Sequence, residues 1–336
     1  MELCDVVDLY VAQAAVTLHW ATELRQRLED PIMRDDDPAG SAAMLDLRSI
    51  GFITMAFGKE RYLEQARTLA RSLKRAMPGH PIAIVTDRTA PGPMFDIVVP
   101  MEAVAQAGTV HKTAMYRYSP FQETLFIDSD CVAVRDFSEQ LRAIRTYDFS
   151  PVVNRYLHAG DRDLWLDDVG FAIAGVNGTG FPKFNGGVYF FRKSAFAEEV
   201  FARSEAIRDR QADLGIRDFD RSGPGEETLI GLALSQMHVT NLYDDDGRLM
   251  RTPLNSSGGI EADPFLGYSR FIKEGALVEP AIIHYCGEWI DHPTYLIAAR
   301  GLRAGRRSGV AVRGAIRARH VSRILARRVR RRLTRI

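Results

Sequence analysis

Blocks of apolar residues with two different spacings follow one another along the first half of the chain. The runs at 49–57 and 81–87 predict buried strands, and KERYLEQARTLARSLKRAMPG between them has the spacing of an amphipathic helix. Further strands are predicted over 94–100 and at LFI, residues 125–127. This alternation predicts an α/β fold in which a mostly parallel central sheet carries helices on both faces.

The second half of the chain has less regular patterns. NGGVYFFRK (185–193) predicts a strand that begins at a tight turn, and HVTNLY (238–243) and PAIIHYCGEW (280–289) predict late strands. Residues 155–184 mix Gly, Asp and aromatic residues without a period, so we expect a loop-rich segment there. Long irregular loops often carry function.

The two ends of the chain differ from this body. Residues 6–29 have helical spacing, and RDDDPAGS (34–41) is typical of a linker. Residues 300–336 hold fourteen Arg and no Asp, Glu or Lys, whereas the rest of the chain has 30 basic and 43 acidic residues. We therefore expect an N-terminal helical extension and linker over 1–45, a main domain over 46–299 and a basic tail over 300–336.

Within this tail, the apolar residues from Val310 onward recur at spacings of roughly three and four, with Arg residues between them. The pattern predicts a basic amphipathic helix, which suits an anionic membrane surface. The same charge would also bind nucleic acid without sequence preference, or would dock on the acidic body of the chain. Membrane attachment is the favoured interpretation.

Composition narrows the class of protein. The 46% hydrophobic and 9% aromatic fractions are typical of a globular protein. No apolar run approaches the ~18 residues of a transmembrane helix, and the first ten residues carry acids where a secretory signal would carry Lys or Arg. The three cysteines are far apart, which argues for a reducing compartment and against a disulfide framework or a structural zinc site. We expect a cytoplasmic protein, at the inner face of the membrane if the tail attaches.

Two carboxylates, Asp128 and Asp130, follow the predicted strand at 125–127 directly. Ligands of open α/β sheets bind at the carboxyl ends of the strands. Carboxylates this close repel each other, and burying them is costly, so a divalent cation would offset both effects. The simpler alternative is that Asp128 caps the next turn and Asp130 is solvated.

Four motifs surround this Asp-Ser-Asp in a fixed order: a Lys in a predicted helix before it, then NGGV, GEE and HYCG after it. Together they resemble the GT-A-fold glycosyltransferases, specifically glycosyltransferase family 8 and its glycogenin-like and galactosyltransferase relatives, over roughly residues 50–292. The resemblance implies a Rossmann-like domain that moves a hexose from a nucleotide sugar, expected to be UDP-linked, to a hydroxyl of a glycan or glycolipid acceptor. It also implies retention of the anomeric configuration and dependence on Mn²⁺ or Mg²⁺.

The resemblance further implies roles for individual residues. Asp128, Asp130 and His284 resemble the metal ligands of the family. The residues that resemble donor contacts are Thr54, Tyr62, Lys112, Asp128, Ser129, Asn185, Gly186 and Gly287. Among them, Tyr62 resembles the aromatic residue that stacks on uracil, and Lys112 the basic residue that faces the donor phosphate or sugar.

Glu226 and Glu227 resemble the acidic and polar pair at the reacting face of the sugar. Relatives commonly have Gln in place of Glu227, so a covalent intermediate on this carboxylate is conceivable, although front-face transfer is favoured. A structural reading accompanies each assignment: both Glu residues would complement a helix dipole, Tyr62 would pack and Lys112 would be solvated. Cys131 and Cys286 are interpreted as packing residues.

Two other functions fit parts of the sequence. A haloacid-dehalogenase-like phosphatase also carries Asp-x-Asp at a strand end, and Val132 fits its motif, but its later Thr or Ser and Lys are not evident. A non-catalytic GT-A-like binding protein would use the Arg-rich tail as its working part.

Overall fold

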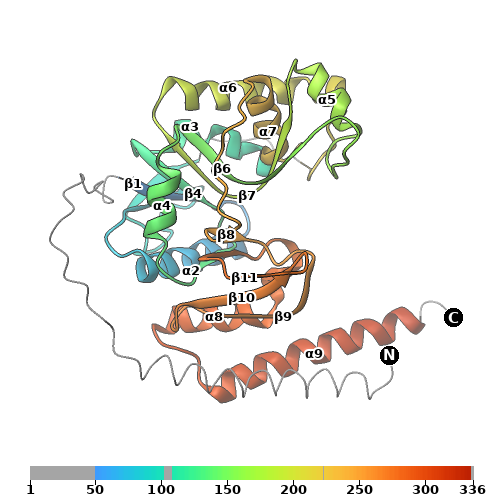
Figure 1. Ribbon diagram of the computed structural model, residues 1–336. Coiled ribbons are helices and arrows are strands. Elements are labelled where there is room, and N and C mark those ends of the chain that lie inside the picture. The colour runs from blue at the N-terminus through green and yellow to red at the C-terminus, as the bar shows by residue number, and fades with distance from the viewer. Residues whose placement is uncertain (1–49, 102–107, 222, 334–336) are drawn as a thin grey trace, which may run out of the picture. The chain divides into compact units, whose positions relative to one another are not determined.

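The computed structural model describes residues 50–101, 108–221 and 223–333 (Figure 1). The helix expected over 6–29 and the linker expected over 34–41 lie outside these residues. All described residues belong to one compact unit.

A six-stranded sheet in the order β3-β2-β1-β4-β7-β6 forms the centre of this unit. Its strands are β1 (Ile50–Met55), β2 (Ile82–Thr86), β3 (Ile97–Pro100), β4 (Glu123–Ile127), β6 (Phe149–Leu157) and β7 (Phe181–Arg192). Strands β3, β2, β1 and β4 are paired in parallel, whereas β7 runs antiparallel to β4 and β6. This arrangement confirms the expected α/β fold with a mostly parallel central sheet.

Helices cover both faces of this sheet, because side chains alternate along each strand. Phe52 of β1 belongs to the same core as Leu73 of α2, and its neighbour Ile53 belongs to the core of Val200 on α6 and Ile230 on α7. Figure 1 shows α2 and α4 on one side and α6 and α7 on the other. The helices are α2 (Glu60–Ala76), η2 (Thr109–Ala114), α3 (Met115–Tyr118), α4 (Ser138–Ile144), α5 (Val169–Gly175), α6 (Ala195–Asp209), η3 (Ala212–Leu214), α7 (Glu226–Gln236), η4 (Gly287–Asp291), α8 (Pro293–Ala304) and α9 (Val310–Leu333).

Two small sheets follow the central one. The first has the order β5-β12-β8 and contains β5 (Cys131–Ala133), β12 (Ile282–His284) and β8 (Met250–Arg251). The second has the order β11-β10-β9 and contains β9 (Ser256–Asp263), β10 (Tyr268–Lys273) and β11 (Ala276–Val278). In the first sheet β12 pairs antiparallel with β5, so that His284 lies opposite Cys131.

Two predicted strands need correction. The strand expected to begin at a tight turn at 185 begins at Phe181, and Asn185 to Gly187 lie inside it. These glycines allow a close approach of other side chains: a Cβ on Gly187 would lie 2.4 Å from His284 Nδ1. The strand expected over 238–243 is absent. The Tyr243 carbonyl accepts one backbone hydrogen bond from the Val153 N–H of β6, but the Tyr243 N–H donates to the Ser150 hydroxyl, so no ladder forms.

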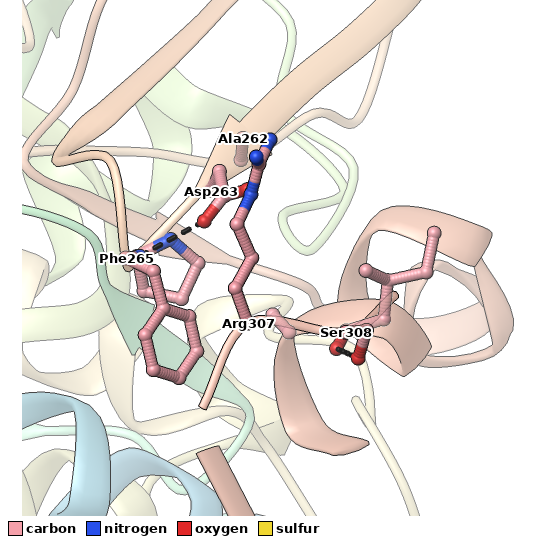
Figure 2. A pocket seen from close by; sticks show the side chains of 8 residues that line it. Ala262, Asp263, Phe265, Arg307 and Ser308 are labelled. Atoms are coloured by element: carbon pink, nitrogen blue, oxygen red, sulfur yellow. Dashed lines mark hydrogen bonds and ion pairs between the residues drawn. The ribbon is translucent and has the colours of Figure 1, made fainter. Parts of the chain in front are cut away.

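The expected C-terminal helix is present as α9. Helix α8 continues through position 300 and ends at Ala304, and the following Gly305, with a φ of 65°, allows the chain to turn toward α9. At this junction Arg307 forms an ion pair with Asp263 at 2.5 Å, and Asp263 also accepts a hydrogen bond from the backbone N–H of Phe265 (Figure 2). These residues line a small pocket that does not include Asp128, Asp130 or His284.

Candidate active site

The Asp-Ser-Asp motif forms the turn between β4 and β5. The Asp128 N–H donates to the Gly187 carbonyl at 2.9 Å, and Asp128 Oδ1 accepts from the Ser129 N–H at 2.9 Å. The capping role is therefore present, but it uses one oxygen only, and Asp128 Oδ2 faces other side chains. Asp130 is not a freely solvated residue, since its side chain is only 20% exposed and its Oδ1 is buried.

His284, the last residue of β12, lies close to the carboxylates of both Asp128 and Asp130. Its Nε2 lies 2.9 Å from Asp130 Oδ1 and 3.7 Å from Asp128 Oδ2. Its Nδ1 lies 2.5 Å from Asn185 Oδ1, which also accepts the Gly187 N–H at 3.0 Å. Because this amide oxygen accepts, Nδ1 carries the hydrogen in the neutral ring, and the Nε2 lone pair faces the acids.

Electrostatic coupling within this group is strong. Burial lowers the pKa of His284, but the carboxylates of Asp130 and Asp128 outweigh burial and raise it above its ordinary value. Burial likewise raises the pKa of Asp130, but His284 and then Lys112 outweigh it and hold the pKa below its ordinary value. The ring is therefore cationic over a wider pH range than a free imidazole in the absence of another cation.

Lys112 connects the motif to the start of α7. Its Nζ lies 2.6 Å from Asp128 Oδ2 and 3.0 Å from Glu226 Oε1, and its side chain is 9% exposed. Burial lowers the Lys112 pKa, but the two carboxylates raise it well above its ordinary value. The ammonium group is thus a fixed positive charge. The alternative that Lys112 is solvated is wrong.

At Glu226 burial outweighs the attraction of Lys112, and it raises the pKa of this carboxyl from 4.5 to about 7. Between these pH values the native state holds a proton that the unfolded state has lost, so rising pH destabilises the wild type.

Glu226→Gln should remove this loss of stability with rising pH. The wild-type free energy of unfolding, relative to the variant, should fall by roughly 3 kcal/mol from pH 4 to pH 8. Urea unfolding at several pH values measures it, and a constant difference would contradict the assignment.

Glu227 is held by a second chain of contacts. Its Oε2 accepts the Gly186 N–H at 3.1 Å, and its Oε1 lies 3.5 Å from Lys183 Nζ, which pairs with Asp163 at 2.9 Å. The sequence interpretation missed Lys183 and Asp163. Lys183 carried a usable signal, because it lies two residues before Asn185 in one strand and so shares its face of the sheet.

The remaining predicted donor contacts are less closely joined to this cluster. Thr54 is buried near the carboxyl end of β1, and its hydroxyl has no hydrogen-bond partner within the described part of the chain. Ser129 is buried beside Asp128, and Gly287 follows β12 with a φ of 61°. Tyr62 lies in the first turn of α2, packs partly on the core and accepts a hydrogen bond from Arg61. Its packing matches the structural alternative, and its role toward a donor stays a prediction.

A third side chain shares the space between Asp130 and His284. Cys131 is fully buried, and one ligand atom from each of Asp130, Cys131 and His284 lies within 4.8 Å of the other two. Burial, and then the carboxylates of Asp130 and Asp128, raise the pKa of the Cys131 thiol well above its ordinary value. A neutral thiol is a poor ligand for a hard cation, so the oxygen and nitrogen donors of Asp128, Asp130 and His284 fit Mn²⁺ or Mg²⁺ better.

No family model matches the sequence, and no curated protein matches it. Similar solved structures are glycosyltransferases by name. The galactosyltransferase LgtC, in complex with donor and acceptor sugar analogues, is 16% identical with a TM-score of 0.45, over 79% of this chain and 99% of LgtC. The bifunctional glycosyltransferase WbbM is 13% identical with a TM-score of 0.39, over 75% of this chain and 47% of WbbM. GlyE of Streptococcus pneumoniae is 14% identical with a TM-score of 0.36, over 59% and 45%. These low similarities concern the fold, and the chemistry of the site depends on its own residues.

Proposed function

We propose that the protein is a metal-dependent glycosyltransferase that moves a hexose from a nucleotide sugar, a UDP-sugar by the resemblance, to a hydroxyl of a glycan or glycolipid with retention of configuration. The observation that carries this proposal is the convergence of Asp128, Asp130 and His284 beyond the carboxyl end of β4. Open α/β sheets bind their ligands at this edge.

The residues present suit a divalent cation. Asp128, Asp130 and His284 would hold Mn²⁺ or Mg²⁺, and the carboxylates around them outnumber the ammonium groups of Lys112 and Lys183. When bound, such an ion acts as a Lewis acid that stabilises the charge of a leaving diphosphate. Asn185 orients His284 through its Nδ1, so that Nε2 is presented as a ligand.

Lys112 and the start of α7 organise the sugar side of the proposed site. Lys112 fixes both Asp128 and Glu226, and Gly186 and Lys183 fix Glu227. Both oxygens of Glu227 are therefore engaged. This supports a role in orienting the sugar, with front-face transfer, rather than a role as the nucleophile of a covalent intermediate.

The acceptor is proposed to bind next to Asp163, whose segment carries exposed apolar side chains. Trp165 follows Asp163 by two residues, and its ring lies 4.9 Å from that of Phe219, which is 45% exposed. Leu164 and Phe171 are also exposed there. Aromatic faces with nearby polar groups are typical of binding sites for small ligands, and they suit the apolar face of a sugar ring.

The test is a hydrolysis and transfer screen of UDP-, GDP- and TDP-sugars, with Mn²⁺ and without it. We expect slow hydrolysis of one UDP-sugar that requires the metal and that an acceptor glycan accelerates. A phosphate-ester substrate panel runs in parallel as the control. Phosphatase activity without nucleotide-sugar hydrolysis would replace this proposal with the phosphatase function.

His284→Ala should lower metal affinity and the rate of transfer together, because one ligand and its hydrogen bond to Asn185 are lost. A water molecule can take the vacated ligand position, so we expect a loss of about 10–100-fold, smaller than that of the Asp variants. Isothermal titration with Mn²⁺ measures the affinity. Unchanged affinity would contradict the ligand role of His284.

Peripheral attachment to an anionic membrane through α9 is also part of the proposal. The helix spans Val310–Leu333 without an acidic residue, and Val310 and Leu325 are 77% and 54% exposed. No helix among the described residues has the length and apolar character needed to cross a membrane. Each Arg near such a surface contributes about 1 kcal/mol.

A chain ending at Ser308 lacks α9 but retains α8 and the ion pair between Arg307 and Asp263. Its comparison with the full chain therefore measures the contribution of the segment that contains α9. It should bind anionic liposomes about 100-fold more weakly than the full chain, because at least three Arg contacts are lost. Co-sedimentation at low and high salt measures this, with neutral liposomes as the control. Equal binding by both chains would contradict the attachment and favour docking of α9 on the acidic body.

A further inference from the structure

The strand pairing around the acidic motif brings a thiol to the same point as the imidazole. Cys131 begins β5, and it lies directly opposite His284 in the antiparallel pair of β5 and β12. Residues in this relation have neighbouring side chains on one face of the sheet. Asp130 precedes Cys131 and reaches His284 Nε2 at 2.9 Å. Three different donor atoms therefore surround one small volume, all within 4.8 Å of one another.

These three donors differ in the cations that they favour. A thiolate, an imidazole and a carboxylate together are a donor set for Zn²⁺, which takes Cys, His and Asp ligands in tetrahedral sites. Mn²⁺ and Mg²⁺ favour oxygen donors and would use Asp128 in place of Cys131. Asp130 and His284 are common to both sets, so the two kinds of ion cannot occupy the cluster together.

We propose that Asp130, Cys131 and His284 form a zinc site that overlaps the metal site of the proposed transferase, so that zinc displaces Mn²⁺ or Mg²⁺ and inhibits transfer. The inhibition rests on the proposed function, whereas zinc binding does not. Binding forms Zn–S, Zn–N and Zn–O bonds in place of bonds from zinc to water. The charge of the ion offsets the burial and the carboxylates that keep the free thiol protonated, so the thiol proton leaves to the solvent without any change of oxidation state. The fourth zinc position is left to water.

The thiol of the nearby Cys286 lies outside the proposed zinc site. Cys286 follows His284 by two residues, but its Sγ lies 3.0 Å from Thr252 Oγ1 and is not part of the cluster. A hydroxyl can replace this thiol and keep the hydrogen bond to Thr252. Cys286→Ser is therefore a matched control for Cys131→Ala, and Cys4→Ser tests the third cysteine of the chain.

Cobalt(II) and zinc titrations of the full chain test the proposal. Wild type, Cys286→Ser and Cys4→Ser should show the near-ultraviolet charge-transfer band of a cobalt–thiolate bond, and Cys131→Ala should lack it. Zinc affinity, measured by competition with a chromophoric chelator, should fall at least tenfold in Cys131→Ala, on the order of 10–100-fold. The ratio of zinc affinity to manganese affinity should fall as well. A band that is absent from wild type, or that depends on Cys286 or Cys4, would overturn the site.

A measurement on wild type alone covers the case in which Cys131→Ala fails to fold. X-ray absorption of the full chain with one equivalent of zinc should show one sulfur ligand at about 2.3 Å together with nitrogen and oxygen ligands. A shell without sulfur would overturn the proposal. If the sulfur ligand is found but no nucleotide sugar is hydrolysed, the zinc site stands and the proposed transferase function falls.

Discussion

Asp130→Asn is expected to abolish metal-dependent transfer while the fold stays intact. The amide keeps the shape of the carboxylate but removes the charge that faces His284 Nε2 and the proposed cation. Loss of one preorganised electrostatic group at a reacting centre costs about 10²–10³-fold in rate, and lost metal affinity adds to this. Initial rates over a range of Mn²⁺ concentrations measure the effect, and circular dichroism checks the fold.

The matched control is Asp136→Asn, an exposed carboxylate of the segment between β5 and α4 whose hydrogen bonds go to Ser138. It should leave the rate within about a factor of two, as expected for a surface change. Asp128→Asn should behave like Asp130→Asn. Activity that survives in Asp130→Asn, or in the presence of a chelator, would remove the basis of the proposed function.

Of the substitutions named here, Lys112→Met should lower the free energy of unfolding most. The substitution removes the buried cation between Asp128 and Glu226 and leaves both carboxylates without it. Removing one partner of a buried pair costs about 3–5 kcal/mol. The loss should be largest at pH 8 and smaller at pH 5, where Glu226, with its pKa of about 7, is protonated. Urea unfolding at both pH values measures it.

A double variant sharpens this experiment. Adding Glu226→Gln to Lys112→Met removes one of the two orphaned charges, so it should restore part of the stability at pH 8, and the two changes should be non-additive. Lys74→Met is the control, because Lys74 pairs with Asp96 at the surface and should cost no more than about 1 kcal/mol. Equal losses for Lys112→Met and Lys74→Met would show that the buried pair does not stabilise the fold.

The sequence predicted strands and helices well where one periodicity dominates. The strand at 125–127 and the helix that begins near Val310 are present because their apolar spacing is set by local geometry. The tight turn expected at 185 was wrong, because the Gly residues after Asn185 serve contacts with α7 and β12 rather than a change of chain direction. Sequence alone gives no view of such tertiary packing.

The candidate site was likewise predicted only in part, because some of its residues belong to local motifs and others come together only in the folded chain. The residues near Asp128 and at His284 belong to recognisable motifs, and the structure brings Lys112, Asn185 and Glu226 to them. Asp163 could not be predicted, since it lies in a segment without a period and becomes part of the cluster only through its ion pair with Lys183.

The pairing of β12 with β5 determines when this cluster can form during protein synthesis. The six-stranded sheet is complete in sequence at Arg192, whereas His284 is 92 residues further along the chain. At roughly 5–20 residues per second, a ribosome adds His284 about 5–18 s after the last residue of the sheet. The nascent domain therefore has time to fold around Asp128, Asp130 and Lys112 before the imidazole emerges. Metal binding at the proposed site needs His284, so it would follow the folding of the sheet and would not template it.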